Sequence, residues 1–443
     1  MPELELNPSK IYKMPSPLFV ENYDNKTLVI SRESANWLLL NNSRQLEIFD
    51  FLADGNCVSE LFQHFPPDAQ KDIYHVLVEL EAKNFEDMTV QHPQEHGIYV
   101  YLTNRCNQRC RHCYMYAGEN TSNELSISEI VNLLKNFSTI GGRVVTFTGG
   151  EVTVRPDFLT IIEAAKELDL TVCVLTNGVL WSQQFIQKAA KYIDEVQVSI
   201  DGFDGESYRA VRGSNAFGDV LVSVNRLVEA GIRVTVAVTP LLDTLLGNEK
   251  RYVDFAKDLL VRYKGKEFFV KFNTELMDGR DITPTEEEND LYRAAIKSIK
   301  NQCSPFSEEE GFAIDHRNNT IFNNCGYGGL TIAANGDVYF CNLTAKCAKQ
   351  GNIRIDSFED IWKKSQKARA LSDVNQLMPC KECALKYICG GGCRVKNFTS
   401  LSGTTIVDEM DTDLTFARDS ICTSSYKTRL YQLMVAANSL FYR

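Results

Sequence analysis

Residues 102–116 read LTNRCNQRCRHCYMY and hold Cys106, Cys110 and Cys113 in the spacing C-x3-C-x2-C. They continue an alternating segment, residues 98–103, that is typical of a β-strand. A structural zinc site needs four ligands in closed tetrahedral geometry, whereas three thiolates in one short loop suit a four-iron cluster with one iron left open. His112 offers a fourth zinc ligand, but its position between two cysteines makes that geometry awkward. The stretch therefore favours an iron–sulfur centre at a strand end.

Working outward, six segments with the alternation of strands are separated by amphipathic helical segments. They are residues 98–103, 144–149, 171–178, 195–202, 233–240 and 268–275. Strict alternation of strand and helix predicts an α/β fold with a parallel sheet and right-handed crossovers, here a partial (β/α)6 TIM-like barrel over residues 93–302. The unusual motifs, including Gly149-Gly150-Glu151 and Asn177-Gly178, all follow strands. This is the end at which such barrels carry their chemistry.

Beyond the barrel, the cysteines return in a loop-rich segment, residues 303–425, followed by a predicted helix over residues 426–443. The clustered ones are Cys325, Cys341, Cys380, Cys383, Cys389, Cys393 and Cys422. Clusters of this kind predict metal or iron–sulfur ligation, and a pair of zinc ribbons is the alternative. The chain has 14 cysteines, and their grouping favours ligation over a disulfide framework in a cytoplasmic protein.

Residues 1–92 have a different pattern. Three strand-like segments, PLFVENY, TLVIS and NWLLLN, precede three helix-like stretches at residues 43–53, 58–65 and 67–83. This order predicts a winged-helix-like module. The charge balance of the chain, 47 − 58 = −11, and the absence of a basic block argue against a nucleic-acid partner. The sequence also lacks an apolar stretch long enough to span a membrane.

The three-cysteine loop resembles the hallmark C-x3-C-x-Φ-C of the radical S-adenosylmethionine enzymes, with His112 at position Φ. The resemblance implies that Cys106, Cys110 and Cys113 hold a [4Fe-4S] cluster. Its open iron would chelate S-adenosylmethionine, and an external reductant of the flavodoxin or ferredoxin type would supply one electron for cleavage to a 5′-deoxyadenosyl radical.

Further residues are assigned to the cofactor by the same resemblance. The triplet Gly149-Gly150-Glu151 is similar to the family's Gly-Gly-Glu-Pro motif, which contacts the methionine amino group, although Val152 stands in the place of proline. Arg212 is expected to pair with the cofactor carboxylate. The full set implied at the cofactor is His112, Gly149, Gly150, Glu151, Asn177, Ser199, Asp201 and Arg212.

The later cysteines resemble those of the SPASM domain, which carries two auxiliary iron–sulfur clusters, expected here to be [4Fe-4S]. The resemblance gives Cys325, Cys341 and Cys393 to an inner cluster, and Cys380, Cys383, Cys389 and Cys422 to an outer one. The fourth ligand of the inner cluster stays open between Cys347, Cys303 and a site left free for a substrate thiolate.

The N-terminal module resembles the leader-peptide recognition elements of ribosomal-peptide maturases, which add an extended leader as a strand at a sheet edge beside a helix. The phrases VSIDGFDGESYRAVRG, NCGYGGLTIAANGDVYFC and YICGGGC resemble subtilosin-type sactipeptide synthases. That family forms thioether links from a cysteine sulfur to an α-carbon of a precursor peptide.

Three alternative functions remain. The first is an enzyme of the same architecture that makes C–C, C–O or β/γ-carbon thioether links. The second is a sulfatase-maturase-like oxidation of a protein side chain. The third is a non-catalytic zinc or leader-binding scaffold.

Overall fold

The computed structural model describes residues 7–92, 97–118, 123–303, 308–317, 319–342, 349–400, 414–416 and 422–442. The chain divides into two compact units. Unit 1 comprises residues 1–94, 306–327 and 368–443, and unit 2 comprises residues 95–305 and 328–367. The segment 303–425, which the sequence assigns to a single domain, is therefore shared between the two units.

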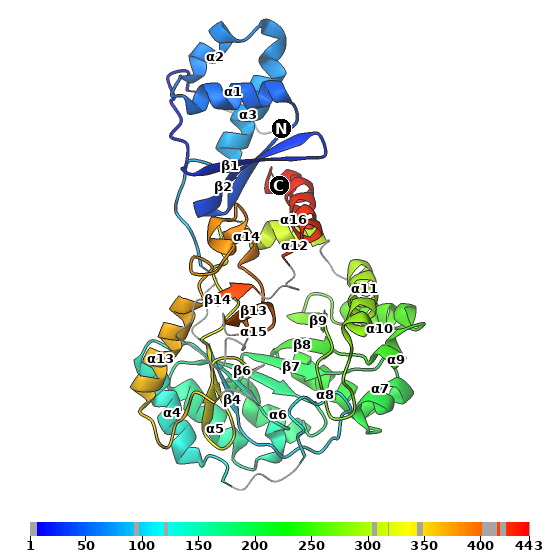
Figure 1. The fold of residues 1–443 in the computed structure, drawn as a ribbon. Helices are drawn as coiled ribbons and strands as arrows, with labels where there is room; N and C mark the ends of the chain where they lie inside the picture. Colours follow the sequence, from blue (N-terminus) through cyan, green and yellow to red (C-terminus); the bar gives the residue numbers. More distant parts are fainter. Residues whose placement is uncertain are drawn as a thin grey trace. The chain divides into compact units, whose positions relative to one another are not determined.

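Unit 2 is built on a nine-stranded sheet of order β12-β11-β10-β4-β5-β6-β7-β8-β9. Figure 1 labels β4 and β6 to β9 of this sheet. Its six consecutive parallel strands are β4 (Gly97–Tyr101), β5 (Val144–Thr148), β6 (Thr171–Thr176), β7 (Glu195–Ser199), β8 (Arg233–Val238) and β9 (Phe268–Phe272). Each strand pairs in parallel with the next one along the chain, as a series of β-α-β units predicts. The predicted α/β partial barrel is confirmed.

Helices join these strands. They are α4 (Ile127–Thr139), α5 (Phe158–Glu167), α6 (Gln183–Ala189), α7 (Gly205–Arg212), α8 (Phe217–Glu229), α9 (Leu242–Leu245), α10 (Glu249–Arg262) and α11 (Glu286–Cys303). Helix α4 begins with the predicted capping box, in which Ser126 Oγ accepts the Glu129 N–H and Glu129 Oε2 accepts the Ser126 N–H. Strand residues such as Val145, Phe147 and Val174 are fully buried and form part of the core.

All six predicted strand segments are too long at their carboxyl ends, and three of them carry motifs there. β5 ends at Thr148, β6 at Thr176 and β7 at Ser199. Gly149 and Gly178 follow with φ angles of 146° and 78°, which take the chain out of the extended conformation. The motifs that the sequence placed within the last strand residues therefore lie in the loops beyond them.

Three short strands of the C-terminal region join the same sheet, which the sequence did not predict. They are β10 (Leu330–Ile332), β11 (Asp337–Tyr339) and β12 (Gly351–Asn352). β10 lies parallel to β4, with Leu330 opposite Ile98, and β11 and β12 continue the sheet in antiparallel fashion. Segments of two or three residues are too short to show an alternation of apolar and polar positions. Helix α13 (Phe358–Leu371) follows.

In unit 1, the N-terminal residues form the expected sheet and helices. The sheet has the order β1 (Leu18–Tyr23), β2 (Lys26–Ser31), β3 (Asn36–Leu40), and all pairs are antiparallel. Asp24 and Asn25, with φ angles of 50° and 58°, make the two-residue turn between β1 and β2. Helices α1 (Ser43–Ala53), α2 (Val58–His64) and α3 (Gln70–Ala82) follow. The third helix begins later than predicted, because residues 67–69 form a 3-10 turn.

C-terminal segments complete unit 1. They are α12 (Glu308–Asp315), α14 (Lys386–Cys389), α15 (Arg394–Asn397), β13 (Phe398–Ser400), β14 (Leu414–Phe416) and α16 (Ser424–Ala437), followed by a 3-10 turn (Asn438–Tyr442). These segments share a core with the N-terminal sheet: Trp37 Nε1 donates to the Met434 carbonyl at 3.2 Å, and the Trp37 ring meets Phe441 edge-on. Among the helices that the structure describes, none is long and apolar enough to cross a membrane.

Candidate active site

The three-cysteine loop leaves the carboxyl end of β4 at the edge where β5, β6 and β7 also end. Backbone N–H groups point at two of its sulfur atoms: Gln108 N–H donates to Cys106 Sγ and Ala117 N–H donates to Cys113 Sγ, both at 3.4 Å. Such N–H donors stabilise negative charge on sulfur. The loop is therefore shaped to present thiolates.

Gly149 and Gly150 support this loop directly. Gly150 N–H donates to the Thr103 carbonyl at 2.7 Å, and a Cβ atom at Gly150 would lie 2.2 Å from the Arg105 carbonyl oxygen. A Cβ atom at Gly149 would lie 2.4 Å from the Thr103 oxygen. The sequence explains the glycines by the approach of a ligand. The structure adds a second reason, since the cysteine loop itself packs against their backbone.

Glu151 is buried, with 1% of its surface exposed, and its carboxylate ties the end of β6 to the glycine turn. Oε1 accepts the hydroxyls of Thr153 and Thr176, both at 2.6 Å, and Oε2 accepts the Asn177 N–H at 2.7 Å. The Asn177 side chain in turn donates to Asn107 Oδ1 at 2.7 Å in the cysteine loop. Glu151 and Asn177 thus lie beside the cysteine loop.

Asp201, Arg212 and His112 form a buried charged group. Asp201 Oδ2 accepts Arg212 Nε at 2.6 Å and lies 3.2 Å from His112 Nε2, while Oδ1 accepts the Thr239 N–H. Burial alone would raise the pKa of Asp201, but the charges of Arg212 and His112 hold it at about 2. The sequence pairs Arg212 with a cofactor carboxylate, whereas the structure gives it a protein carboxylate. Ser199 is the last residue of β7, opposite Ala237.

Two residues of this region were missed by the sequence reasoning. Gln108 donates to the Tyr208 hydroxyl at 2.7 Å and accepts from Arg212. Arg280, which follows β9, donates to the carbonyls of Cys110 and Ala117. Gln108 lies within the loop, between Cys106 and Cys110, but nothing in the spacing marks it, and only the fold brings Arg280 to the loop.

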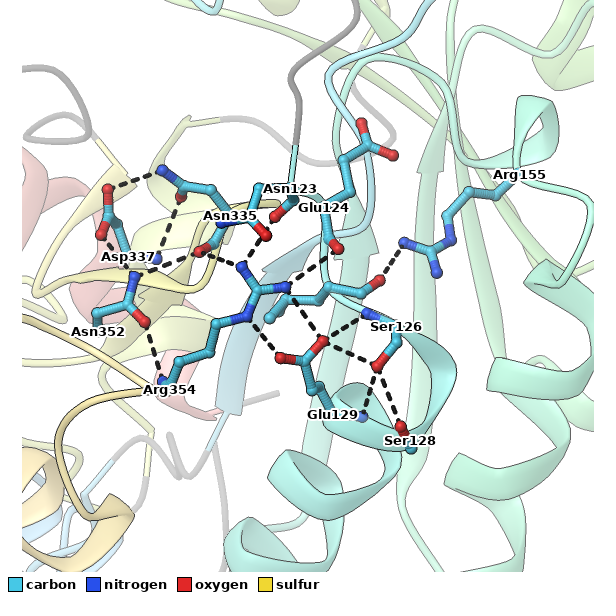
Figure 2. Close-up of polar contacts among 11 residues, drawn as sticks. Asn123, Glu124, Ser126, Ser128, Glu129, Arg155, Asn335, Asp337, Asn352 and Arg354 are labelled. Carbon is cyan, nitrogen blue, oxygen red and sulfur yellow. Dashed lines mark hydrogen bonds and ion pairs between the residues drawn. The ribbon is translucent and has the colours of Figure 1, made fainter.

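Figure 2 shows a polar cluster that connects the β10–β12 segment to the barrel. The Arg354 guanidinium binds the Glu129 carboxylate, with Nε and Oε1 2.5 Å apart, and donates to the carbonyls of Asn123 and Glu124 at 2.9 and 3.1 Å. The Glu124 carboxylate accepts the Thr103 hydroxyl at 2.6 Å and the Asn104 N–H at 3.0 Å. Arg354 is therefore two contacts away from the start of the cysteine loop.

In unit 1, four cysteines line one cavity: Cys380, Cys383, Cys389 and Cys422. The other walls include Pro379, Leu385, Tyr426 and Leu430, and the Tyr426 hydroxyl lies 3.5 Å from Cys389 Sγ. These four cysteines are the set that the sequence assigns to the outer cluster, although Cys422 is 33 or more residues from the others along the chain. The fold of unit 1 brings them together.

The remaining predicted ligands are distributed over both units. Cys325 and Cys393 lie in unit 1, where the N–H of Arg394 donates to Cys325 Sγ at 3.4 Å. Cys341 lies in unit 2, just after β11. Cys347 falls outside the described residues. The Cys303 thiol, at the end of α11, donates to the Val253 carbonyl of α10.

The donor sets fit iron–sulfur clusters. Burial raises the pKa of the Cys106 thiol to about 11 and that of Cys380 to about 12, so each set needs a cationic group to exist as thiolates. Within the described residues, no three Cys, His, Asp or Glu side chains converge tightly enough for a single metal ion. Nδ1 of His112 is buried without a hydrogen-bond partner, as expected where a ligand completes the site. His112 Nε2 faces Asp201, which disfavours it as a zinc ligand.

Comparison with known proteins identifies the domains. The Radical SAM superfamily model matches residues 100–256, and the model of the SPASM iron-sulfur cluster-binding domain matches residues 324–384. The AdoMet-dependent heme synthase of Methanosarcina barkeri is 27% identical over 326 residues, which cover 68% of this chain and 91% of that protein. The mycofactocin maturase MftC of Mycobacterium tuberculosis (strain CDC 1551 / Oshkosh) is 26% identical over 319 residues, which cover 67% and 78%.

Among solved structures, native anSMEcpe with bound AdoMet superposes with a TM-score of 0.55 at 16% identity, covering 78% of this chain and 99% of that one. The two family matches show that this chain carries a radical S-adenosylmethionine domain and a SPASM domain. Its cofactors are S-adenosylmethionine and iron–sulfur clusters, one in the barrel and auxiliary ones in the SPASM domain.

Proposed function

We propose that this enzyme is a peptide maturase that forms thioether crosslinks, from a cysteine sulfur to an α-carbon, in a ribosomally synthesised precursor peptide. The observation that carries the proposal is the presence of two separate cysteine sets, one at the barrel mouth and one lining a cavity of unit 1. Thioether formation from a thiol and a C–H bond removes two hydrogens. One leaves as a hydrogen atom and the other as an electron and a proton, so the reaction needs a hydrogen-atom acceptor and a separate electron acceptor, and the thiol proton passes to solvent.

The chain's residues have distinct tasks in this reaction. Cys106, Cys110 and Cys113 bind the catalytic cluster, and the N–H groups of Gln108 and Ala117 hold charge on the sulfurs. When bound, the cluster and S-adenosylmethionine would supply the chemistry that removes a hydrogen atom from carbon, and the auxiliary clusters would supply an electron acceptor.

Around the cofactor, we assign Glu151 and Asn177 to the methionine end of S-adenosylmethionine. We assign the Asp201–Arg212 pair to the opposite wall of the cofactor site. The buried Nδ1 of His112 is assigned to a polar atom of the cofactor. Gly149 and Gly150 keep the cysteine loop against these groups.

The substrate class follows from the sequence resemblance and the N-terminal module. A relative named mycofactocin maturase supports a maturation reaction, whereas a relative named as a heme synthase at similar identity shows that the barrel and SPASM regions alone do not specify the substrate. Residues 7–92, folded as a three-stranded sheet with three helices, are a suitable leader-binding element. The precursor peptide with its leader is the proposed partner.

The test uses the full-length protein with reconstituted clusters, S-adenosylmethionine and a reductant under anaerobic conditions. The substrate is the synthetic peptide encoded by the short cysteine-containing reading frame nearest the gene. We expect 5′-deoxyadenosine and a product that has lost two hydrogens per link and resists thiol alkylation at the linked cysteine. A product that loses hydrogens but keeps all its cysteines alkylatable assigns the bond to C–C or C–O instead.

A further inference from the structure

Arg394 is fully buried in unit 1, with 0% of its surface exposed. Its side chain donates to four backbone carbonyls: Nε to Ser372 at 2.7 Å, Nη1 to Gly390 at 2.8 Å and to Gly392 at 2.7 Å, and Nη2 to Asn323 at 3.0 Å. Peptide carbonyls are neutral, so these bonds fix the guanidinium in place without cancelling its charge. Because arginine keeps its proton in proteins, Arg394 is a permanent cation in the interior of unit 1.

The turn after Cys389 is built to hold this cation. Residues 390–392, all of them glycine, have φ angles of 68°, 78° and 70°, a left-handed conformation that glycine adopts without steric cost. Two of their carbonyls accept hydrogen bonds from Arg394 Nη1. A Cβ atom at Gly391 would lie 3.0 Å from Arg394 Nη1 and 3.5 Å from Cys380 Sγ, so the guanidinium and that thiol flank the same glycine. Since Gly391 lines the cavity of the four cysteines, Arg394 lies directly behind one wall of that cavity.

Arg394 also reaches the other set of cysteines. Its backbone N–H donates to Cys325 Sγ at 3.4 Å, and its neighbour in the chain is Cys393. These two cysteines are assigned above to the inner cluster, whereas Cys380 and Cys389 are assigned to the outer one. The charge of Arg394 interacts with Cys325, Cys380 and Cys389. It opposes the burial that raises the pKa of the Cys380 thiol to about 12. One cation is therefore shared between the two sets.

We propose that Arg394 is the counter-charge of the auxiliary iron–sulfur clusters, which raises their reduction potentials and so makes them better electron acceptors. The reduction potential of an iron–sulfur site depends on its net charge and on the charges and hydrogen bonds around it. Reduction adds one electron and no proton, so the negative charge of the site grows by one. A fixed cation nearby stabilises the reduced form more than the oxidised form. This role rests on the ligand sets proposed above, and it holds whichever bond the enzyme forms.

The alternative is that Arg394 is only an anchor, which joins the glycine turn to Ser372 and Asn323. Asp373 also interacts with the Arg394 charge, and its carboxylate accepts hydrogen bonds from the Asn323 and Asn375 side chains. Two substitutions separate charge from bonding. Arg394→Lys keeps the charge, but the three donors of one ammonium group cannot span the four carbonyls. Arg394→Gln removes the charge as well as these bonds. The two variants therefore differ only if the charge matters.

The main experiment is a redox titration of the full-length protein with reconstituted clusters, followed by electron paramagnetic resonance. Cys106, Cys110 and Cys113 are replaced together by alanine, so that the signals come from the auxiliary clusters alone, and neither peptide nor S-adenosylmethionine is added. For Arg394→Gln we expect the equilibrium constant for reduction of both clusters to fall about tenfold or more, which is a shift of about 59 mV for a one-electron couple. Arg394→Lys should change that constant by less than about threefold.

Arg317→Gln is the control, because Arg317 is an exposed arginine of the same unit, and it should leave both potentials unchanged. Equal shifts in the two Arg394 variants, or no shift in either, would overturn the counter-charge. If Arg394→Gln loses its auxiliary iron, the lysine variant decides: retained iron at a nearly unaltered potential supports the proposal, and loss of iron from both variants contradicts it. A shift found in an enzyme that forms no thioether would reject the proposed function alone, and thioether formation with unshifted potentials would reject the counter-charge alone.

Discussion

Arg212 and Asp201 form a buried ion pair in which Arg212 Nε donates to Asp201 Oδ2 at 2.6 Å. Their side chains expose 9% and 1% of their surface. The pair joins the loop after β7 to the last turn of α7, and through Gln108 it reaches the cysteine loop. Because the pKa of Asp201 is held at about 2, despite burial, both partners are charged at neutral pH.

The Asp201→Asn variant should lose about 3–5 kcal/mol of stability, because it leaves Arg212 buried without a counter-charge. The folded-state pKa of about 2 lies below the ordinary value of 3.8, so the pair's contribution is present above about pH 4 and is lost as the pH falls towards 2. Denaturant unfolding at several pH values measures both effects. Glu267→Gln, which breaks an exposed pair with Arg233, is the control and should change stability by less than about 1 kcal/mol. Equal losses in the two variants would contradict the prediction.

The Gly150→Ala variant should displace the cysteine loop, since its Cβ atom would lie 2.2 Å from the Arg105 carbonyl oxygen, which is backbone and cannot rotate away. We expect the protein to fold but to cleave S-adenosylmethionine at least tenfold more slowly, with less iron retained in the barrel. Gly218→Ala in α8 is the matched control, because no atom lies within 4 Å of its added Cβ. Normal cleavage by Gly150→Ala would show that the loop tolerates the shift.

The Arg354→Ala variant tests the polar cluster of Figure 2. It removes the bonds to Glu129, Asn123 and Glu124, which are partly exposed, so the loss is about 1 kcal/mol after solvent screening. The melting temperature should fall by about 2–4 °C, and the rate of S-adenosylmethionine cleavage should fall as Glu124 loosens from the cysteine loop. Lys363→Ala, which removes an exposed pair with Glu359, should change neither. A lower melting temperature with an unaltered cleavage rate would restrict Arg354 to a structural role.

The Cys341→Ala variant separates hydrogen removal from bond formation. If Cys341 is a ligand of the inner auxiliary cluster, its loss should leave 5′-deoxyadenosine production partly intact and eliminate the crosslinked product. Iron analysis and mass spectrometry of the peptide report the two effects separately. Cys57→Ser, at the start of α2 in unit 1, should retain iron and product. If the Cys341→Ala variant still produces crosslinked peptide, Cys341 is not required for bond formation.

The sequence predicts the elements whose signal is local. The strands β4 to β9 are indicated by short-range alternation of residues, and the cysteine loop is indicated by the spacing of its cysteines. Both are found where expected. The partners of Arg212 and Arg280 could not be predicted in this way. Each depends on which loops the barrel brings together, so Arg212 meets Asp201 across 11 residues and Arg280 reaches Cys110 across 170.

The addition of β10–β12 to the sheet was also missed, because so few residues per strand carry no periodic signal. Division of the chain into two units was missed for a related reason. The N-terminal module has its own apolar core, including Leu38, Ile48 and Leu77, so its sequence indicates a domain that is independent of the rest of the chain. Only the structure shows Trp37, Lys83 and Glu79 joined to residues near the other end of the chain.

That joining has a consequence for how the protein is made. Lys83 and Asn438 are separated by 355 residues, so the Lys83 and Glu79 side chains, which bond to the backbone of β3, cannot gain their bonds to Asn438 until residue 438 has been synthesised. Closing so long a loop is slow compared with folding of local elements. A nascent chain that carries residues 7–92 already has the side chains that bond to the backbone of Trp37 and Leu39, but it lacks the Asn438 amide that holds two of them in place. The backbone of β3 is therefore bonded early, and the buried ion pair of Glu79 and Lys83 gains its last amide partner only when the distant Asn438 docks.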